Sequence, residues 1–388
     1  MPRNLVICCD GTSNQFGVQN TNVVRLIQSL DRDPTRQRLY YDPGVGTLPE
    51  PGFVTAIGKW FSDVCGLAFG AGLLWKVQEA YAYLMNMWEP EDHVFLFGFS
   101  RGAYTVRVLA GLLHELGLLP RSNDNLIPYV TRLFKTARKD QTLGRAEPKS
   151  QYWQLREDFR RTFARPTFAG DAERRFPIHF LGVWDTVSSV GWVWDPAKFP
   201  YTAHNPSIRI VRHAVSIDER RWFFRQNLME KTGDQDFHQL WFPGVHCDVG
   251  GGYPESEGGL WRVAFDWMIA EASRPTAGLL IDPERYAAVV NTTPPPDKPW
   301  AEPKHESLTA LWWPAQFFPK LCYYPQWRCR LPTLGCKKLR HIENGQPIQH
   351  SALTRIRESA YIPRNLSTRF LNEVRSLTQV PDSLPYKR

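Results

Sequence analysis

The sequence has 388 residues, of which 43% are hydrophobic and 22% are charged. This length accommodates one large domain or two ordinary ones, and the composition is that of a folded chain and excludes wholesale disorder. The formal net charge of +8 favours anionic surroundings such as phospholipid surfaces, nucleic acid or acidic substrates. The sequence has no long run of Lys and Arg and no zinc-finger or RNA-binding motif, so we expect no nucleic-acid partner.

The cysteines and the apolar segments indicate the compartment. The seven cysteines include no C-x-x-C pair and do not suggest a disulfide framework. No secretory signal precedes the first apolar run, and the glycine-rich stretch at residues 65–75 is too short to span a bilayer. We expect a soluble, reduced protein made in the cytoplasm, and export without a cleaved signal peptide is compatible with this sequence.

Predicted strands and helices alternate along the first half of the chain. The continuous apolar runs at residues 5–9 and 93–97 predict strands buried on both faces. Further strands are predicted at 38–41, 177–184 and 238–242, and helices at 22–30, 73–87 and 101–116. This alternation predicts an α/β fold with a mostly parallel, doubly wound sheet.

Two segments stand apart from that pattern. Residues 120–175 are charged, mostly helical in pattern and inserted between strands, so they are predicted to form a cap-like insertion. A proline-rich break at 293–297 precedes residues 297–388, whose stretch at 311–327 is dense in Trp, Phe and Tyr. We predict a single domain over 1–388, with 297–388 as a helical extension packed on the core.

The sharpest motif is Gly98-Phe99-Ser100-Arg101-Gly102, between a predicted strand and a predicted helix. This G-x-S-x-G context is the nucleophile elbow of α/β-hydrolases, in which a strained turn exposes a serine hydroxyl. The elbow glycines Gly98 and Gly102 permit the crowded backbone. A tight turn with an incidental serine is the alternative interpretation.

A serine nucleophile needs a general base and an orienting carboxylate, which follow it in this chain order in α/β-hydrolases. His246 follows the strand predicted at 238–242 and precedes a glycine-rich turn, while Asp185 follows the strand predicted at 177–184. Both lie just past a strand, at the edge where open α/β sheets place their chemistry. His246 is the predicted base and Asp185 the predicted acid, with Asp195 and Asp248 as rivals for the acid.

An oxyanion would need two backbone N–H donors. The N–H of Arg101, at the start of the predicted helix, is the first candidate. The second is expected from the loop that follows the first strand, at Gly11 or Thr12. Asp10 and Asp248 are candidates for ordering their loops, and a simple capping role for Asp10 is equally compatible with the sequence.

These motifs resemble the type VI secretion phospholipase effector catalytic domain, an α/β-hydrolase family of bacteria and fungi. The resemblance is carried by residues 9–12, 98–104, 184–187 and 243–253, and extends to 350–353 and 361–366, nearly the whole chain. It implies a Ser-Asp-His triad at Ser100, Asp185 and His246, and hydrolysis of glycerophospholipid acyl esters. No metal or organic cofactor is required for this chemistry.

The predicted function is a serine hydrolase that cleaves carboxylic esters of lipids or small molecules through an acyl-enzyme. Residues 52–74 and 311–327 could form an apolar entrance, and their Trp and Tyr side chains, with the net positive charge, suit peripheral membrane contact. Core packing is the alternative role for these aromatics. Two other functions stay open: a non-catalytic binding module, and a haloacid-dehalogenase-like phosphatase that uses Asp10, although Cys8 stands where that enzyme needs its nucleophilic aspartate.

Overall fold

The structure is a computed structural model. It describes residues 2–11, 17, 19–44, 69–142, 149–187, 191–192, 195–196, 199–291, 296–309, 312–317, 320–324, 329–335 and 339–388. The predicted entrance segment at 52–74 therefore lies mostly outside the described residues, as does part of the aromatic stretch at 311–327.

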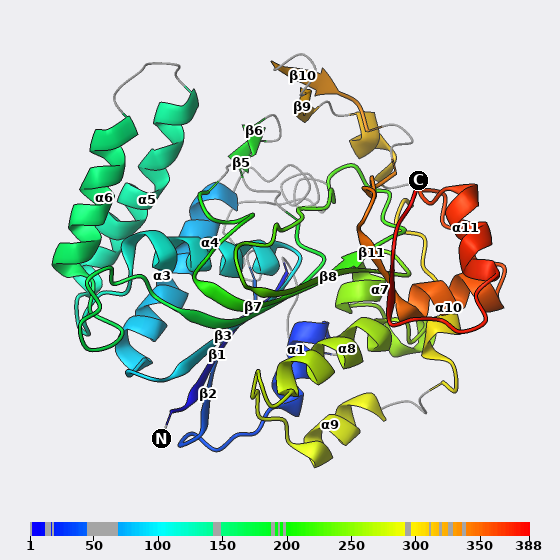
Figure 1. Cartoon of the computed structure of the whole chain (residues 1–388), viewed down its shortest axis with the longest axis horizontal. Coiled ribbons are helices and arrows are strands. Elements are labelled where there is room, and N and C mark those ends of the chain that lie inside the picture. Colours follow the sequence, from blue (N-terminus) through cyan, green and yellow to red (C-terminus); the bar gives the residue numbers. More distant parts are fainter. Residues whose placement is uncertain are drawn as a thin grey trace, which may run out of the picture.

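Eight strands form one sheet through the centre of the molecule, in the order β12-β11-β8-β7-β4-β3-β1-β2 (Figure 1). Its strands are β1 (Asn4–Cys9), β2 (Gln37–Asp42), β3 (His93–Phe99), β4 (Ile178–Trp184), β7 (Ile208–Ser216), β8 (Asp236–Phe242), β11 (Pro347–Gln349) and β12 (Ser383–Pro385). Neighbouring strands pair in parallel from β2 to β11, and β12 pairs antiparallel with β11 at the edge. This arrangement confirms the predicted α/β fold with a mostly parallel sheet.

Helices cover both faces of the sheet, as Figure 1 shows. One face carries α3 (Phe69–Met87), α4 (Arg101–Leu116), α5 (Ile127–Thr142) and α6 (Lys149–Phe163). The other face carries α1 (Asn22–Ser29), α8 (Trp261–Ser273) and α9 (Pro283–Val290). The short α7 (His246–Gly250) follows β8, and α10 (His350–Glu358) and α11 (Thr368–Arg375) pack at the β11 edge.

Short elements complete the described chain. The hairpins β5 (Gly191–Trp192) with β6 (Asp195–Pro196) and β9 (Lys320–Tyr324) with β10 (Cys329–Thr333) lie outside the central sheet. Single 3-10 turns lie at Asp124–Leu126, Glu255–Glu257, Pro299–Ala301 and Pro314–Phe317. Within the described ranges, no helix combines the length and the apolar character needed to cross a bilayer.

The continuous apolar runs reflect a sheet that is buried on both faces. Along β1, Leu5 and Ile7 pack toward α3 and α4, whereas Val6 and Cys8 pack toward α1 and α8. Successive side chains of a strand point to opposite faces, so a strand between two helical layers needs an apolar residue at every position. The same alternation runs along β3, which ends directly before Ser100.

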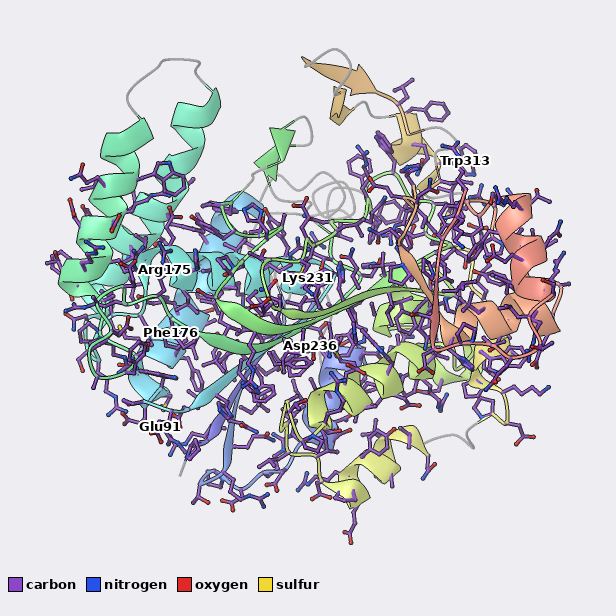
Figure 2. All side chains as sticks on the ribbon, in the orientation of Figure 1. Glu91, Arg175, Phe176, Lys231, Asp236 and Trp313 are labelled. Atoms are coloured by element: carbon purple, nitrogen blue, oxygen red, sulfur yellow. The ribbon has the colours of Figure 1, made fainter. Side chains whose placement is uncertain are left out.

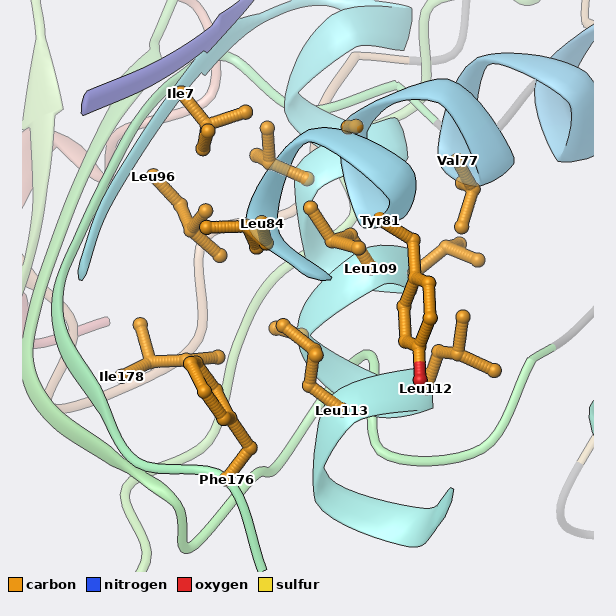
Figure 3. Close-up of a cluster of buried hydrophobic side chains, with 14 of the residues drawn as sticks. Ile7, Val77, Tyr81, Leu84, Leu96, Leu109, Leu112, Leu113, Phe176 and Ile178 are labelled. Atoms are coloured by element: carbon orange, nitrogen blue, oxygen red, sulfur yellow. The ribbon is translucent and has the colours of Figure 1, made fainter. Parts of the chain in front are cut away.

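A large apolar cluster lies between the sheet and helices α3 and α4 (Figure 3). Leu109 and Leu113 of α4 are fully buried there beside Tyr81 of α3, whose hydroxyl donates to the carbonyl of Gly117 and accepts the N–H of Leu119. Because α4 begins directly after Ser100, this cluster holds the helix that starts at the elbow.

The main difference from the sequence prediction is β7, which the apolar pattern does not reveal. Arg212 and His213 interrupt the run, yet both are buried. Arg212 pairs with Glu271 and Asp236, and Nδ1 of His213 lies 2.8 Å from Oε1 of Gln239. Because these partners lie in other elements, the local sequence pattern cannot show that the two polar side chains have hydrogen-bond partners when they are buried.

The two segments predicted to stand apart both pack on the core. In the insertion, Arg156 of α6 forms a buried ion pair with Glu115 of α4. In the extension, β11, β12, α10 and α11 form a third apolar cluster with Trp241 of β8. The cap-like role of residues 120–175 and the single-domain boundary stay predictions.

Truncating Leu109 tests whether α4 depends on this cluster. Leu109→Ala should lower the free energy of unfolding by about 2–5 kcal/mol, because it opens a cavity in a fully buried layer. The matched control is Leu155→Ala on α6, where the side chain is 50% exposed and the expected change stays within about 0.5 kcal/mol. Denaturant unfolding measures both, and equal losses would contradict the described packing.

Candidate active site

Ser100 lies at the turn from β3 into α4, in a backbone conformation that few serines adopt. Its φ of 57° and ψ of −120° lie outside the regions favoured by L-residues. Neighbouring strands hold the turn, because the Ser100 N–H donates to the carbonyl of Trp184 at 3.1 Å and its carbonyl accepts the N–H of Val187 at 3.2 Å. The side chain is thereby fixed above the carboxyl ends of β3 and β4.

The predicted elbow glycines lie where a side chain would not fit. A Cβ at Gly102 would overlap the carbonyl oxygens of Cys9 and Asp10, so α4 begins against the end of β1. A Cβ at Gly98 would overlap the backbone of Ala103 at the start of the helix. Close backbone approach therefore requires glycine at both positions.

His246 reaches Ser100 from the start of α7, directly after β8. Its Nε2 lies 2.8 Å from Oγ of Ser100, and the imidazole is 98% buried. The rings of Phe99 and Phe224 lie with their centroids 4.6 Å and 4.9 Å from the imidazole, so two aromatic side chains pack against it.

Asp185 contacts the other side of the imidazole. It follows β4 with a φ of 38°, and its Oδ2 lies 2.5 Å from Nδ1 of His246. Its Oδ1 accepts the backbone N–H of Ser216, at the end of β7, at 2.8 Å. The structure thus brings Ser100, His246 and Asp185 into one continuous hydrogen-bonded chain.

Burial and charge set the protonation of this chain. Burial alone would raise the pKa of the Asp185 carboxyl, but the positive charge of Arg340 and the hydrogen bond with His246 outweigh it, so the pKa falls well below its usual range. Burial lowers the pKa of His246 below its usual value, although the bond to Asp185 opposes that shift. At neutral pH the carboxylate is ionised and the imidazole is neutral, so its Nε2 can accept a proton.

The rival carboxylate Asp248 makes no described contact with the imidazole and bonds elsewhere. Asp248 accepts the N–H of Val245 at 2.9 Å and lies 2.6 Å from Nδ1 of His305, contacts that order the turn into α7. The side chain of Asp195 lies outside the described residues.

The loop after β1 lies beside the elbow, and Asp10 accepts one of its backbone amides. The Gly11 N–H donates to Oδ1 of Asp10 at 2.7 Å, so it does not point freely at Ser100. Asp10 also accepts the hydroxyl of Thr21 at 2.6 Å, which ties the loop to the start of α1. Thr12 lies outside the described residues, and Arg101 is the first residue of α4, as expected.

Three residues that sequence analysis missed surround the chain of bonds. Arg340 forms a bidentate ion pair with Asp185, at 2.5 Å and 2.9 Å. Glu219 accepts the backbone N–H of His246 at 3.2 Å and pairs with Arg221 at 2.9 Å. Identifying β7 would have drawn attention to Glu219 and Arg221, which follow it, whereas no motif marks Arg340.

A second, partly buried serine–histidine pair offers a comparison. Oγ of Ser207 lies 2.6 Å from Nδ1 of His114, but Nε2 of His114 faces the Arg175 guanidinium at 3.0 Å instead of a carboxylate. Burial and this positive charge lower the pKa of His114 to about 3. The pair therefore lacks the group that would support an imidazolium.

In the described part of the aromatic stretch at 311–327, the ring of Trp312 lies next to the site. Trp312 lies edge-on to Phe224 with centroids 5.4 Å apart, and Phe224 contacts His246. The next residue, Trp313, is 40% exposed and lies near the β9–β10 hairpin (Figure 2). In the part of the chain that the structure describes, no group of three or more His, Cys, Asp and Glu side chains could hold a metal ion.

A parallel sheet flanked by helices, with a serine on a strained strand-to-helix turn, defines an α/β-hydrolase-like protein. The chain belongs to the family described as T6SS phospholipase effector Tle1-like, catalytic domain, whose model matches residues 3–271. Membership confirms the predicted resemblance, and the segments at 350–353 and 361–366 lie beyond the matched residues.

Three known proteins are similar to parts of this chain. The uncharacterized protein YEL023C of Saccharomyces cerevisiae is 33% identical over 233 residues, which cover 58% of this chain and 32% of that protein, so the chain spans about a third of this relative. A crystal structure of an uncharacterized protein from Pseudomonas aeruginosa matches with 21% identity and a TM-score of 0.40, covering 74% of this chain and 47% of that chain. The structure of the Tle1 effector bound to the VgrG spike matches with 19% identity and a TM-score of 0.34, covering 65% and 52%.

Gly102→Ala separates two opposing effects at the elbow. Helix propensity alone would stabilise the alanine variant by about 1 kcal/mol. The overlap with Cys9 and Asp10 should dominate and lower the free energy of unfolding by about 1–3 kcal/mol. Denaturant unfolding decides between them, with Ala103→Gly, which adds no atom, as the control, and a more stable Gly102→Ala would contradict the described contact.

Proposed function

We propose that this chain is a serine hydrolase that cleaves carboxylic acyl esters, with Ser100 as nucleophile, His246 as general base and Asp185 as the orienting carboxylate. The observation that supports it is the bond chain from Oγ of Ser100 through both imidazole nitrogens to Oδ2 of Asp185. Three side chains far apart in sequence meet in the order and at the distances that nucleophilic catalysis requires.

The catalytic cycle has two halves. Nε2 of His246 takes the Ser100 proton as Oγ attacks the acyl carbonyl, and His246 then gives that proton to the leaving alcohol. Water hydrolyses the acyl-enzyme by the same route, with His246 again as the base. Asp185 keeps the Nδ1–H tautomer and stabilises the transient imidazolium.

The oxyanion is held first by the Arg101 N–H at the start of α4. The second donor comes from the loop at 10–12. For Gly11 to serve, its N–H would have to exchange the bond to Asp10 for one to the oxyanion. Asp10 and Asp248 then act as loop-ordering residues.

The proposed substrates are lipid acyl esters, including phospholipids. Family membership supports this class, and so do the aromatic rings of Phe99 and Phe224 beside His246, which suit an acyl chain. The Arg221 guanidinium over Phe224 and the net positive charge suit an anionic head group and peripheral contact with an anionic bilayer.

The alternatives have less support. A non-catalytic module would not need a buried carboxylate aligned on an imidazole, because such an alignment is costly to bury. In a phosphatase, Asp10 would need to be available to substrate, whereas it is 98% buried and bonded to Thr21 and Gly11.

Ser100→Ala should abolish hydrolysis of p-nitrophenyl and phospholipid esters, lowering kcat by roughly a millionfold as triad knockouts do. A fluorophosphonate probe should label the wild type and not this variant. Ser207→Ala is the matched control, because Ser207 also contacts a buried histidine but has Arg175 in place of a carboxylate. An active Ser100→Ala enzyme, or labelling that depends on Ser207, would contradict the assignment.

The pH profile should reflect the buried imidazole. His246 must be neutral to act as a base, and burial lowers its pKa below 6.5. Activity should therefore persist below pH 6.5 and disappear only as the pH falls through that lowered value, while Asp185 stays ionised throughout. Measuring kcat/KM against pH tests this, and an acid limb centred above the ordinary histidine value would be inconsistent with the site.

A further inference from the structure

We propose that Arg340, in the C-terminal extension, is a positioning residue that fixes the Asp185 carboxylate and limits the basicity of His246. The inference rests on the proposed function of Ser100, His246 and Asp185. Arg340 lies beyond residue 271, where the family match ends. The extension would therefore be part of the catalytic apparatus.

Arg340 and Asp185 form a buried, bidentate ion pair. Nη1 of Arg340 donates to Oδ1 of Asp185 and Nη2 donates to Oδ2, so the guanidinium grips both oxygens. The same guanidinium donates to the hydroxyl of Ser216 at 2.7 Å and to the carbonyl of Phe224 at 2.6 Å. One side chain thus ties the carboxylate to the end of β7 and to the loop that carries the ring beside His246.

The hydrogen-bond acceptor sites of the Asp185 carboxylate are all occupied. A carboxylate offers about four lone-pair sites, and Asp185 uses them for the Ser216 N–H, the two Arg340 nitrogens and His246. Any rotation about its side-chain torsions would break a bidentate pair in a buried site. Oδ2 therefore stays aligned with Nδ1 of His246.

The extension holds the surrounding loops at several further points. Ser307 donates to Glu219, whose other oxygen accepts the His246 N–H. Tyr361 donates to Asp218, and Asn365 donates to the carbonyls of Ile217 and Arg340. The extension thus makes a series of polar contacts along the loop after β7, and Arg340 is the member of that series that reaches Asp185.

The charged groups around the imidazole explain why Arg340 would limit the basicity of His246. The titratable groups that face His246 or its carboxylate partner are Asp185, Glu219, Arg221, Cys247, Arg340 and, behind Asp185, His213. Arg340 and His246 bond the same oxygen, Oδ2. When His246 gains a proton, a second positive charge therefore lies beside Oδ2, whose negative charge Arg340 already neutralises.

The test uses the full chain and three variants. Arg340→Gln removes the charge, Arg340→Lys keeps the charge but loses the fork, and Arg355→Gln is the control. Arg355 lies in the same extension, donates to the carbonyls of Trp300 and Glu302 and packs over the Tyr361 ring, with no described contact to Asp185. The readouts are kcat/KM against pH, normalised by fluorophosphonate titration, and the imidazole ¹⁵N titration of His246 in a Ser100→Ala background.

In Arg340→Gln the titration of His246 and the acid limb of kcat/KM should both move upward by about one unit, because a nearby positive charge is gone. Arg340→Lys should titrate like the wild type, while its kcat falls by about ten- to a hundredfold through loss of alignment. Arg355→Gln should change neither. A purely structural Arg340 would lower the fraction of active enzyme without moving the titration.

Two results would overturn the proposal. One is an Arg340→Gln protein in which His246 titrates at the wild-type pH with wild-type kcat. The other result applies if that variant does not fold: an Arg340→Lys protein with wild-type kcat would show that the bidentate guanidinium contact is not needed. The NMR titration requires no turnover, so it decides the role of Arg340 even if Ser100→Ala remains active and the proposed function fails.

Discussion

The site depends on keeping one carboxylate ionised in the interior of the protein. Moving a charge out of water costs several kcal/mol unless hydrogen bonds and an opposite charge replace the lost hydration. At Asp185 the replacement comes from three directions: the Ser216 N–H, the Arg340 guanidinium and His246. Without it, burial would favour the protonated acid, which could neither hold the Nδ1–H tautomer of His246 nor support an imidazolium.

The sheet order explains why these groups can meet. β3, β4, β7 and β8 are consecutive neighbours and parallel, so their carboxyl ends lie along one edge. Ser100, Asp185, Ser216 and His246 each lie at or just past one of those ends. Their alignment needs unusual backbone at two points, the positive φ of Ser100 and of Asp185, and the flanking ladder bonds hold both. Strain at such positions persists only where the surrounding structure fixes it.

Much of this arrangement could be predicted from the sequence, for identifiable reasons. β1, β3 and β4 are buried on both faces, so their apolar runs are continuous, and the elbow motif marks the end of β3. The sequence did not reveal β7, because the buried Arg212 and His213 find their polar partners only through the tertiary fold. Arg340 lies in a segment without periodicity and meets Asp185 across 155 positions. The bond from the Gly11 N–H to Asp10 depends on a side-chain torsion that no residue pattern encodes.

The electrostatics of the site are a balance between groups from distant parts of the chain. Asp185 with Arg340 and Glu219 with Arg221 form two ion pairs, so the site is neutral when His246 is neutral. In our proposal Arg340 secures the carboxylate but weakens the support that this carboxylate gives to an imidazolium, and the positive charge of Arg221 also lowers the pKa of His246. Glu219 acts in the opposite sense, because its negative charge lies at the His246 N–H and favours protonation of the ring. If the proposed role of Arg340 holds, the basicity of His246 depends on the loop after β7 and the C-terminal extension together, and either segment could tune it without altering Ser100.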